Sequence, residues 1–397
     1  MNLFRRLAAN IALLLLTVGG LAAIPTALAA DSGPIKIGLI LPMTGQQAST
    51  GRQIDAAVKL WLAQNGSKVA GRTVEVILKD DGAVPDTTKR LAQELIVNDK
   101  VTVLAGFGIT PTALATAPLA TQSKTPLVVM AAATSSITQA SPFIVRTSFT
   151  LPQVTVAIAD WAAKNKIKRA ISLVADYGPG FDAEKFFESQ FRLNGGQVMD
   201  KLRTPLRAPD FAPVLQKVAD AKPDALFVFL PSGQGAAFMK QFGERGLDKS
   251  GVRLIATGDV TDDDQLNDMG DVAVGVVNSH HYSAAHPSPT NQKFVKAFEA
   301  QNKFRPNFMA VGGYDGMRVI YKALEASKGE GGEKLLEAMK GQIFESPRGP
   351  VLIDAQTRDI VQDVYIRKVE RVAAMGNQLY NVEFDVIKQV KDPGKAK

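Results

Sequence analysis

Two short segments rich in hydroxyl groups each follow an apolar run that is typical of a buried strand. Thr110-Pro111-Thr112 follows the run at 101–105, and Ala132-Ala133-Thr134-Ser135-Ser136 follows the run at 127–131. Each segment also begins a stretch of helical character, where free amides and the positive end of the helix dipole attract a carboxylate. Because parallel strands end at one edge of a sheet, where open α/β sheets bind ligands, the pair predicts a carboxylate site. The alternative is simple helix capping, the more common role of such residues.

A glycine pair in the same region, Gly106-Phe107-Gly108, partly matches a dinucleotide-binding loop. The third glycine of that motif is missing, with Pro111 near its place, and no acidic residue stands about twenty positions later to hold a ribose. We therefore expect no nucleotide cofactor.

Other residues that could do chemistry lack the partners that such chemistry needs. His280, His281 and His286 are the chain's three histidines, and their segment offers no carboxylates at metal-binding spacing. Asp262-Asp263-Asp264 lacks the spaced oxygen ligands of a calcium loop and is interpreted as a solvated helix start. Ser232 lies in Pro-Ser-Gly-Gln-Gly, which is not a nucleophile elbow. The sequence predicts no metal, no cofactor and no catalytic site; a hydrolase of small amides is the rival from the enzyme class.

Strand and helix patterns alternate through the first third of the chain. Apolar or alternating runs predict strands at 35–41, 73–79, 101–105 and 127–131, with helices at 52–65, from Pro85 onward and at 111–123. This alternation predicts a parallel sheet with helices on both faces.

The pattern then restarts after an irregular stretch at 141–152, which we interpret as a crossing between lobes. A helix at 154–165, strands at 170–175, 225–230, 253–257 and 272–277, and antiparallel strands at 364–366 and 380–384 follow. The fold class predicted is α/β, with two doubly wound parallel-sheet lobes that face each other across a cleft. We assign 35–149 plus 280–345 to lobe 1, 152–278 plus 350–388 to lobe 2, and 389–397 to a basic, frayed tail.

The first thirty residues have the pattern of a cleaved signal peptide. Arg5 and Arg6 precede the apolar run around 13–16, and small residues end the segment at Ala29-Ala30. A transmembrane anchor fits less well, because the apolar run is broken early. The chain has no cysteine, which excludes disulfides and a lipid-modified cysteine at the cleavage point. We expect a protein released into the periplasm.

The formal net charge is +7, with lysine and arginine scattered among acidic residues. Such a distribution favours solubility and not nucleic-acid binding.

Several stretches, taken together, resemble the leucine/isoleucine/valine-binding proteins, the periplasmic receptors of branched-chain amino-acid ABC transporters. The resembling residues are Lys36 to Gly45, Gly51, Asp80-Asp81, Pro85, Pro142 to Thr147, Asp176-Tyr177-Gly178 and Ala256-Thr257-Gly258-Asp259. The resemblance covers nearly the whole chain after residue 30. It implies the type I periplasmic binding fold, in which three chain segments form the hinge between the lobes.

The resemblance also implies ligand-binding roles for individual residues. Thr110 corresponds to the hydroxyl that binds the ligand carboxylate, Ala132 to a backbone contact, and Thr134 to a second hydroxyl. Tyr177 corresponds to a second-lobe aromatic residue that covers the ligand. Asp259 stands where the family commonly has an acid facing the ligand's ammonium group.

Three departures from the family pattern concern the side-chain pocket. Thr50 stands where the branched-chain binders have an aromatic wall, Phe229-Leu230-Pro231 lacks an expected tyrosine, and Asp259 is one carbon shorter than the usual glutamate. Near the hinge, His280-His281-Tyr282 and Phe149 supply aromatic groups instead.

The resemblance implies that the chain is the substrate-binding component of an ABC importer and closes on a small carboxylate, a branched-chain or other hydrophobic amino acid. The departures keep an aromatic or keto acid open as the ligand. A chemosensory adaptor is the rival role among binding proteins, and the sequence alone does not separate the two roles. The expected partner is a membrane permease, and the expected state is a monomer.

Overall fold

The computed structural model describes residues 33–395, so the predicted signal peptide lies outside the described residues. Within the described part of the chain, no helix is long and apolar enough to cross a membrane.

The first sheet has six strands in the order β2-β3-β1-β4-β5-β6, and only its β2–β3 pair is antiparallel. Its central strands are buried apolar runs, as parallel strands covered on both faces must be. The strands are β1 (Ile35–Leu41), β2 (Lys68–Val69), β3 (Arg72–Asp80), β4 (Val103–Gly106), β5 (Leu127–Val129) and β6 (Ile144–Arg146). The helices around this sheet are α1 (Ala48–Asn65), α2 (Pro85–Val97), α3 (Thr110–Ser123), α9 (Pro289–Asn302), α10 (Phe308–Ala326) and α11 (Gly332–Met339).

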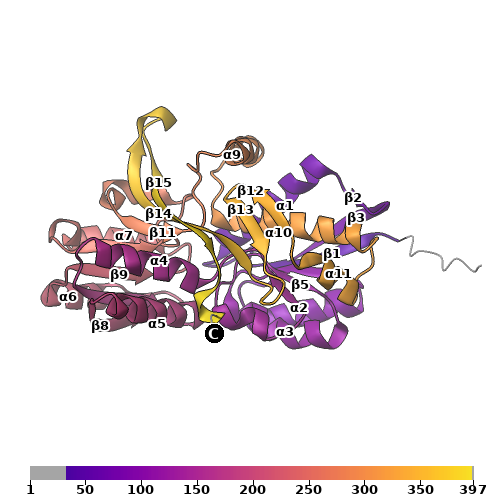
Figure 1. Ribbon diagram of the computed structural model, residues 1–397, viewed down its shortest axis with the longest axis horizontal. Helices are drawn as coiled ribbons and strands as arrows, with labels where there is room; N and C mark the ends of the chain where they lie inside the picture. The colour runs from indigo at the N-terminus through magenta and orange to yellow at the C-terminus, as the bar shows by residue number, and fades with distance from the viewer. Residues whose placement is uncertain (1–32, 396–397) are drawn as a thin grey trace, which may run out of the picture. The chain divides into compact units, whose positions relative to one another are not determined.

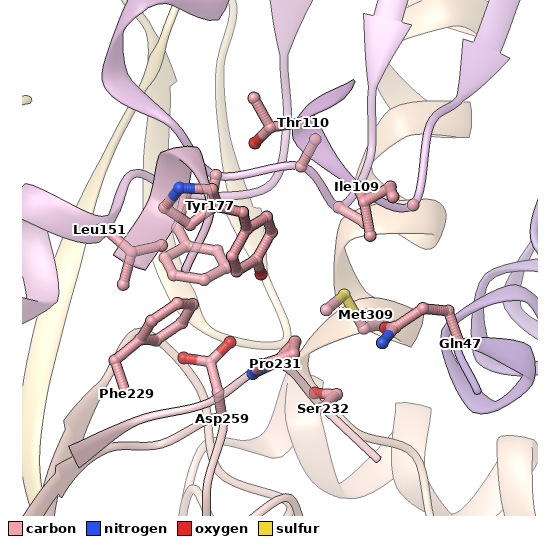
Figure 2. A pocket seen from close by; sticks show the side chains of 16 residues that line it. Gln47, Ile109, Thr110, Leu151, Tyr177, Phe229, Pro231, Ser232, Asp259 and Met309 are labelled. Atoms are coloured by element: carbon pink, nitrogen blue, oxygen red, sulfur yellow. The ribbon is translucent and has the colours of Figure 1, made fainter. Parts of the chain in front are cut away.

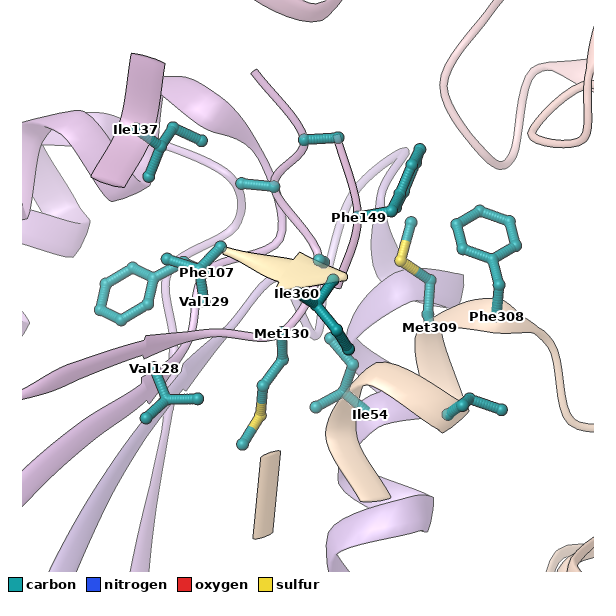
Figure 3. Packing of buried hydrophobic residues seen from close by; sticks show 14 of the residues in the cluster. Ile54, Phe107, Val128, Val129, Met130, Ile137, Phe149, Phe308, Met309 and Ile360 are labelled. Carbon is teal, nitrogen blue, oxygen red and sulfur yellow. The ribbon is translucent and has the colours of Figure 1, made fainter. Parts of the chain in front are cut away.

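Helix α10 comes from late in the chain but packs against α1 and the end of β5 (Figure 1). Two glycines permit the close approach. A Cβ atom at Gly312 would lie 2.2 Å from the carbonyl oxygen of Met130, and one at Gly313 would lie 3.0 Å from the side chain of Ile54. Figure 3 shows Ile54, Met130, Met309 and Phe308 in the resulting core.

The second sheet has nine strands, in the order β12-β13-β14-β11-β10-β9-β7-β8 with β15 on β14. Strands β7 to β11 are mutually parallel, and β12 to β15 close the sheet with antiparallel pairs. The strands are β7 (Arg169–Ala175), β8 (Gln197–Thr204), β9 (Ala225–Phe229), β10 (Arg253–Thr257), β11 (Val277–His280), β12 (Ile343–Ser346), β13 (Gly349–Ile353), β14 (Ile360–Val372) and β15 (Gln378–Val390). The α-helices that accompany it are α4 (Leu151–Lys164), α5 (Gly178–Leu193), α6 (Ala212–Ala221), α7 (Gly235–Glu244) and α8 (Leu266–Met269).

Three predicted segments differ from the structure. The irregular stretch 141–152 contains β6, a strand of three residues that is too short to show a periodic pattern. The strand predicted at 272–277 is wrong, because Gly270–Ala273 forms a 3-10 turn and Gly275 has φ +87°, so β11 begins only at Val277. The prediction that the C-terminal tail is frayed is wrong for the residues up to Lys395. Strand β15 reaches Val390, and Lys395 is an ion-pair partner of buried Asp359.

Buried ion pairs join the segments that run between the two sheets. Arg146 pairs with Asp359 at 2.9 Å, and Arg348 pairs with Asp315 at 2.9 Å, with all four side chains at most 2% exposed. Arg348 also donates to the backbone carbonyl oxygens of Thr147 and Ser148. We place the boundaries of the two lobes at these connecting segments, and this division of the chain remains a prediction.

Candidate functional site

A small cavity lies where the carboxyl ends of the parallel strands in both sheets meet (Figure 2). The empty space between its lining atoms is about 340 Å³, which includes space open to solvent. The elements around the first sheet contribute Gln47, Gly108, Ile109, Thr110, Ala131, Ala132, Ala133, Phe149 and Met309; those around the second contribute Leu151, Tyr177, Pro179, Phe229, Pro231, Ser232 and Asp259. Five of the residues predicted from the sequence therefore lie at this cavity: Thr110, Ala132, Phe149, Tyr177 and Asp259.

The first-lobe side of the cavity is made by the loops after β4 and β5. Thr110 opens α3, and its hydroxyl shares a 2.8 Å hydrogen bond with the Thr134 hydroxyl. The glycine at 106 serves the turn that leads into this loop, since it has φ +109° and a Cβ there would lie 2.3 Å from the carbonyl oxygen of Ile40. This packing requirement, and not a nucleotide, accounts for Gly106.

The second-lobe side is aromatic. Tyr177 precedes the first turn of α5, and its ring stacks on that of Phe229 with centroids 6.1 Å apart. Burial, with a smaller contribution from nearby Asp259, raises the pKa of the Tyr177 hydroxyl well above its ordinary value. Gly178 brings this wall against the first lobe, because a Cβ there would lie 2.8 Å from the Thr134 hydroxyl.

Asp259 follows β10 and is 4% exposed. Its Oδ2 atom has no hydrogen-bond partner among residues 33–395, and the nearest cationic candidate is Nε2 of His280 at 3.5 Å. Burial lowers the pKa of His280 to about 4, so the imidazole is neutral at ordinary pH. Among the described residues, no positively charged side chain pairs with Asp259 at ion-pair distance, although buried Arg367 attracts it electrostatically. A buried carboxylate with an unpaired oxygen is costly unless a ligand supplies a partner. His280, and not its neighbour His281, is the histidine next to Asp259.

Four residues predicted for the site lie behind the cavity and not on its surface. Thr134 is hydrogen-bonded to the lining residue Thr110, and Thr50 is buried next to Gly108. His281 packs against Phe149, with ring centroids 4.9 Å apart. Tyr282 is fully buried in the core. They support the lining residues instead of forming the wall.

Several lining residues were not predicted from the sequence. Gln47 directly precedes α1 and Ile109 directly precedes α3, both at the ligand edge of the first sheet, so the strand-end rule would have found them. Ser232 was considered only as a nucleophile, although it follows strand β9 at the same edge as Asp259. Met309 comes from α10, and no local pattern connects it with this edge.

The interpretation of Asp262-Asp263-Asp264 as a solvated helix start is wrong. Asp262 and Asp263 are at most 2% exposed. Asn307 at the start of α10 donates to Asp262 at 3.0 Å, while Ser49 of α1 donates to Asp264 at 2.6 Å. The acidic run therefore joins the second sheet's loop to the helices of the first lobe. Among the described residues, no cluster of acidic or histidine side chains could hold a metal ion.

A family model described as periplasmic binding protein matches residues 34–375. The chain belongs to the periplasmic binding protein family. The Leu/Ile/Val-binding protein homolog 6 of Brucella abortus (strain 2308) is 43% identical over 390 residues, which are 97% of this chain and 98% of the relative. The resemblance inferred from the sequence is confirmed.

Solved structures of similar chains agree on the fold and on the class of protein. A solute-binding protein of an ABC transporter from Rhodopseudomonas palustris BisB5, in complex with 3,4-dihydroxybenzoic acid, is 60% identical, with TM-score 0.90 over 91% of this chain and 99% of that one. A solute-binding protein from R. palustris in complex with 4-hydroxybenzoate is 41% identical, with TM-score 0.88 over 91% and 99%. A leucine-binding protein from Thermotoga maritima MSB8 is 26% identical, with TM-score 0.79 over 89% and 99%.

The fold is therefore the two-lobed type I periplasmic binding fold, as predicted. The chain is a solute-binding protein of an ABC transporter and not an enzyme. Proteins of this class bind small ligands and work with a membrane permease.

Proposed function

We propose that the ligand is an aromatic carboxylate with a hydroxyl group on the side of the ring opposite the carboxylate. The observation that carries this proposal is the separation of the polar groups in the cavity. Figure 2 places Thr110 at one end, Asp259 and Ser232 at the other, and the aromatic side chains between them. A rigid ring with polar substituents at opposite ends matches this layout.

The carboxylate belongs at the Thr110 end. Thr110 lines this end of the cavity and is the first residue of α3, a helix of 14 residues. Amides at a helix start and the positive end of its dipole favour an anion. Thr134 fixes the orientation of the Thr110 hydroxyl through their hydrogen bond.

The ring belongs between the aromatic and apolar side chains. Tyr177, Phe229 and Phe149 surround this part of the cavity, and Leu151 and Met309 complete it. Aromatic pairs in offset or edge-on geometry contribute about 0.5–1.5 kcal/mol beyond the burial of their area.

The hydroxyl belongs at Asp259. A phenolic hydroxyl can donate to the carboxylate oxygen that lacks a partner, and this hydrogen bond offsets the cost of burying the charge. The relatives at 60% and 41% identity bound 3,4-dihydroxybenzoic acid and 4-hydroxybenzoate, which have such a hydroxyl, and this supports the proposal.

A hydrophobic amino acid is the second candidate, and the buried carboxylate of Asp259 is the feature that favours it. Its ammonium group would pair with Asp259, as the family resemblance implies. However, the ammonium and carboxylate of an α-amino acid share one carbon atom, whereas Thr110 and Asp259 lie at opposite ends of the cavity (Figure 2). The layout therefore favours the aromatic acid.

Binding proceeds by hinge closure. The carboxylate docks first on the loops around Thr110 and Ala132, and the second lobe then covers the ring. Contacts such as Ser49 with Asp264, and Asn307 with Asp262, hold the lobes together. The permease recognises the closed form. We further propose that the chain is a monomer, exported through cleavage after Ala29 or Ala30. The intact mass of exported protein tests the cleavage, since a full-length species in the membrane fraction contradicts it.

Calorimetric titration of the wild-type protein with 4-hydroxybenzoate, benzoate and leucine tests the ligand. We expect binding in the order 4-hydroxybenzoate, benzoate, then leucine. Tight binding of leucine without measurable binding of 4-hydroxybenzoate would exclude the aromatic acid.

A further inference from the structure

The end of the cavity at Asp259 contains a second polar side chain whose role is unexplained. Ser232 lines the cavity and is 2% exposed. Its hydroxyl has no hydrogen-bond partner among residues 33–395, like Oδ2 of Asp259. Buried polar groups almost always have a partner in native proteins. Two such groups at one end of a ligand cavity therefore point to two polar substituents on the ligand.

The topology explains why these two side chains are adjacent. Strands β9 and β10 are parallel neighbours, with Val228 opposite Ala256. Ser232 and Asp259 both lie in the first turn of chain beyond these strands, and Figure 2 shows them on either side of Pro231. Neighbouring strands are about 4.8 Å apart. Side chains that extend from the ends of two neighbouring strands can bind oxygen atoms on neighbouring ring carbons.

Close packing fixes the position of Ser232. Gly233 has φ +95°, and a Cβ at Gly235 would lie 1.9 Å from the carbonyl oxygen of Val260, the residue after Asp259. The loop after β9 is thereby held against the loop after β10. Ser232 also lies within hydrogen-bonding reach of the buried carboxylate of Asp262, and its hydroxyl lowers the pKa of that group. A purely structural role beside Asp262 is the alternative that a test must separate.

We propose that Ser232 binds a second ring hydroxyl, next to the one bound by Asp259, so that the ligand class is an ortho-dihydroxylated aromatic acid. This inference rests on the proposed function, because it assumes the aromatic ring and the hydroxyl at Asp259. Ser232 then determines specificity between acids with one ring hydroxyl and acids with two.

The test compares Ser232→Ala with wild type by calorimetric titration with 3,4-dihydroxybenzoate and 4-hydroxybenzoate. Wild type should bind the dihydroxy acid more tightly. The variant should lose about 3- to 10-fold in affinity for 3,4-dihydroxybenzoate, the equivalent of one neutral hydrogen bond, and less than about 2-fold for 4-hydroxybenzoate.

Ser172→Ala is the matched control. Ser172 is a second-lobe serine, 1% exposed, whose hydroxyl also has no partner among the described residues, but it does not line the cavity. Its replacement should leave both affinities unchanged. Gln47→Met shows whether Gln47, which lines the cavity from the first lobe, binds the second hydroxyl in place of Ser232. A selective loss in Gln47→Met and none in Ser232→Ala would overturn the inference.

The outcomes separate this inference from the proposed function. If wild type binds both acids with equal affinity, or if Ser232→Ala weakens both equally, the role of Ser232 is refuted and the aromatic ligand stands. If wild type binds leucine and neither aromatic acid, both proposals are refuted. Melting temperatures of all variants identify any loss that comes from unfolding.

Discussion

Two buried aspartates, Asp315 at the hinge and Asp259 at the cavity, differ in whether the protein supplies partners for their carboxylates. Asp315 accepts from Ser346 at 2.6 Å and pairs with Arg348 at 2.9 Å, and neither ion-pair side chain is exposed. Asp259 is buried almost as deeply, yet its neighbour His280 is neutral at ordinary pH and lies 3.5 Å away. A buried charge whose partners all come from the protein stabilises the fold. One that lacks such partners marks the place where a ligand must supply them.

The largest expected effect is at the hinge. Arg348→Met leaves the carboxylate of Asp315 buried without a counter-charge, and it removes the hydrogen bonds to Thr147 and Ser148. Breaking a buried pair from one side costs about 3–5 kcal/mol. Urea denaturation should show that loss in the free energy of unfolding. The double variant with Asp315→Leu should recover part of it, and a loss below about 1 kcal/mol in the single variant would contradict the comparison.

The second effect is a pH dependence from His280. Its pKa is about 4 in the folded protein because of burial, whereas it is about 6.5 in an unfolded chain. Between these values the unfolded state binds more protons, so the free energy of unfolding falls as pH drops from about 6.5 to about 4. The contribution is about 3 kcal/mol over this window.

Asp262 and Asp315 have raised pKa values, also from burial, and they act in the opposite direction. The informative quantity is therefore the difference between wild type and His280→Phe. The replacement ring fits beside Phe149 and Phe308, whose centroids lie 4.7 and 4.2 Å from that of His280. The variant should lose less stability than wild type on acidification, and parallel pH curves would show that His280 titrates normally.

The third effect concerns the carboxylate end of the cavity. Thr110→Val removes a hydroxyl that faces the ligand, and Thr134→Val removes the hydroxyl that orients it. A hydrogen bond to a charged group contributes about 1.5–3 kcal/mol, so we expect affinity losses of about ten- to a hundredfold, larger for Thr110 than for Thr134. Titration with 4-hydroxybenzoate measures both. Unchanged affinity in both variants would mean that the two hydroxyls serve only the fold.

The sequence predicted best what depends on local periodicity and on strand ends. The run 35–41 is strand β1, and Thr110 and Ala132 lie at the predicted edge, because apolar runs and the parallel-sheet rule suffice there. By contrast, the burial of Asp262 depends on Asn307, which is distant in the sequence. The position of Ser232 and Asp259 at the same cavity depends on β9 lying next to β10. Such tertiary contacts leave no local pattern, so these features could be found only in the structure.

The most direct test of the central claim is the affinity of wild type and Asp259→Asn for 4-hydroxybenzoate, benzoate and leucine. If Asp259 accepts from a ring hydroxyl, the variant should bind 4-hydroxybenzoate about 5- to 10-fold more weakly, since a charged acceptor becomes neutral. It should bind benzoate equally well or more tightly, because a buried charge without a partner is removed. Leucine should bind neither protein tightly. Tight binding of leucine by the wild type, lost by about 2–5 kcal/mol in the variant, would show that Asp259 pairs with an ammonium group and would contradict the account.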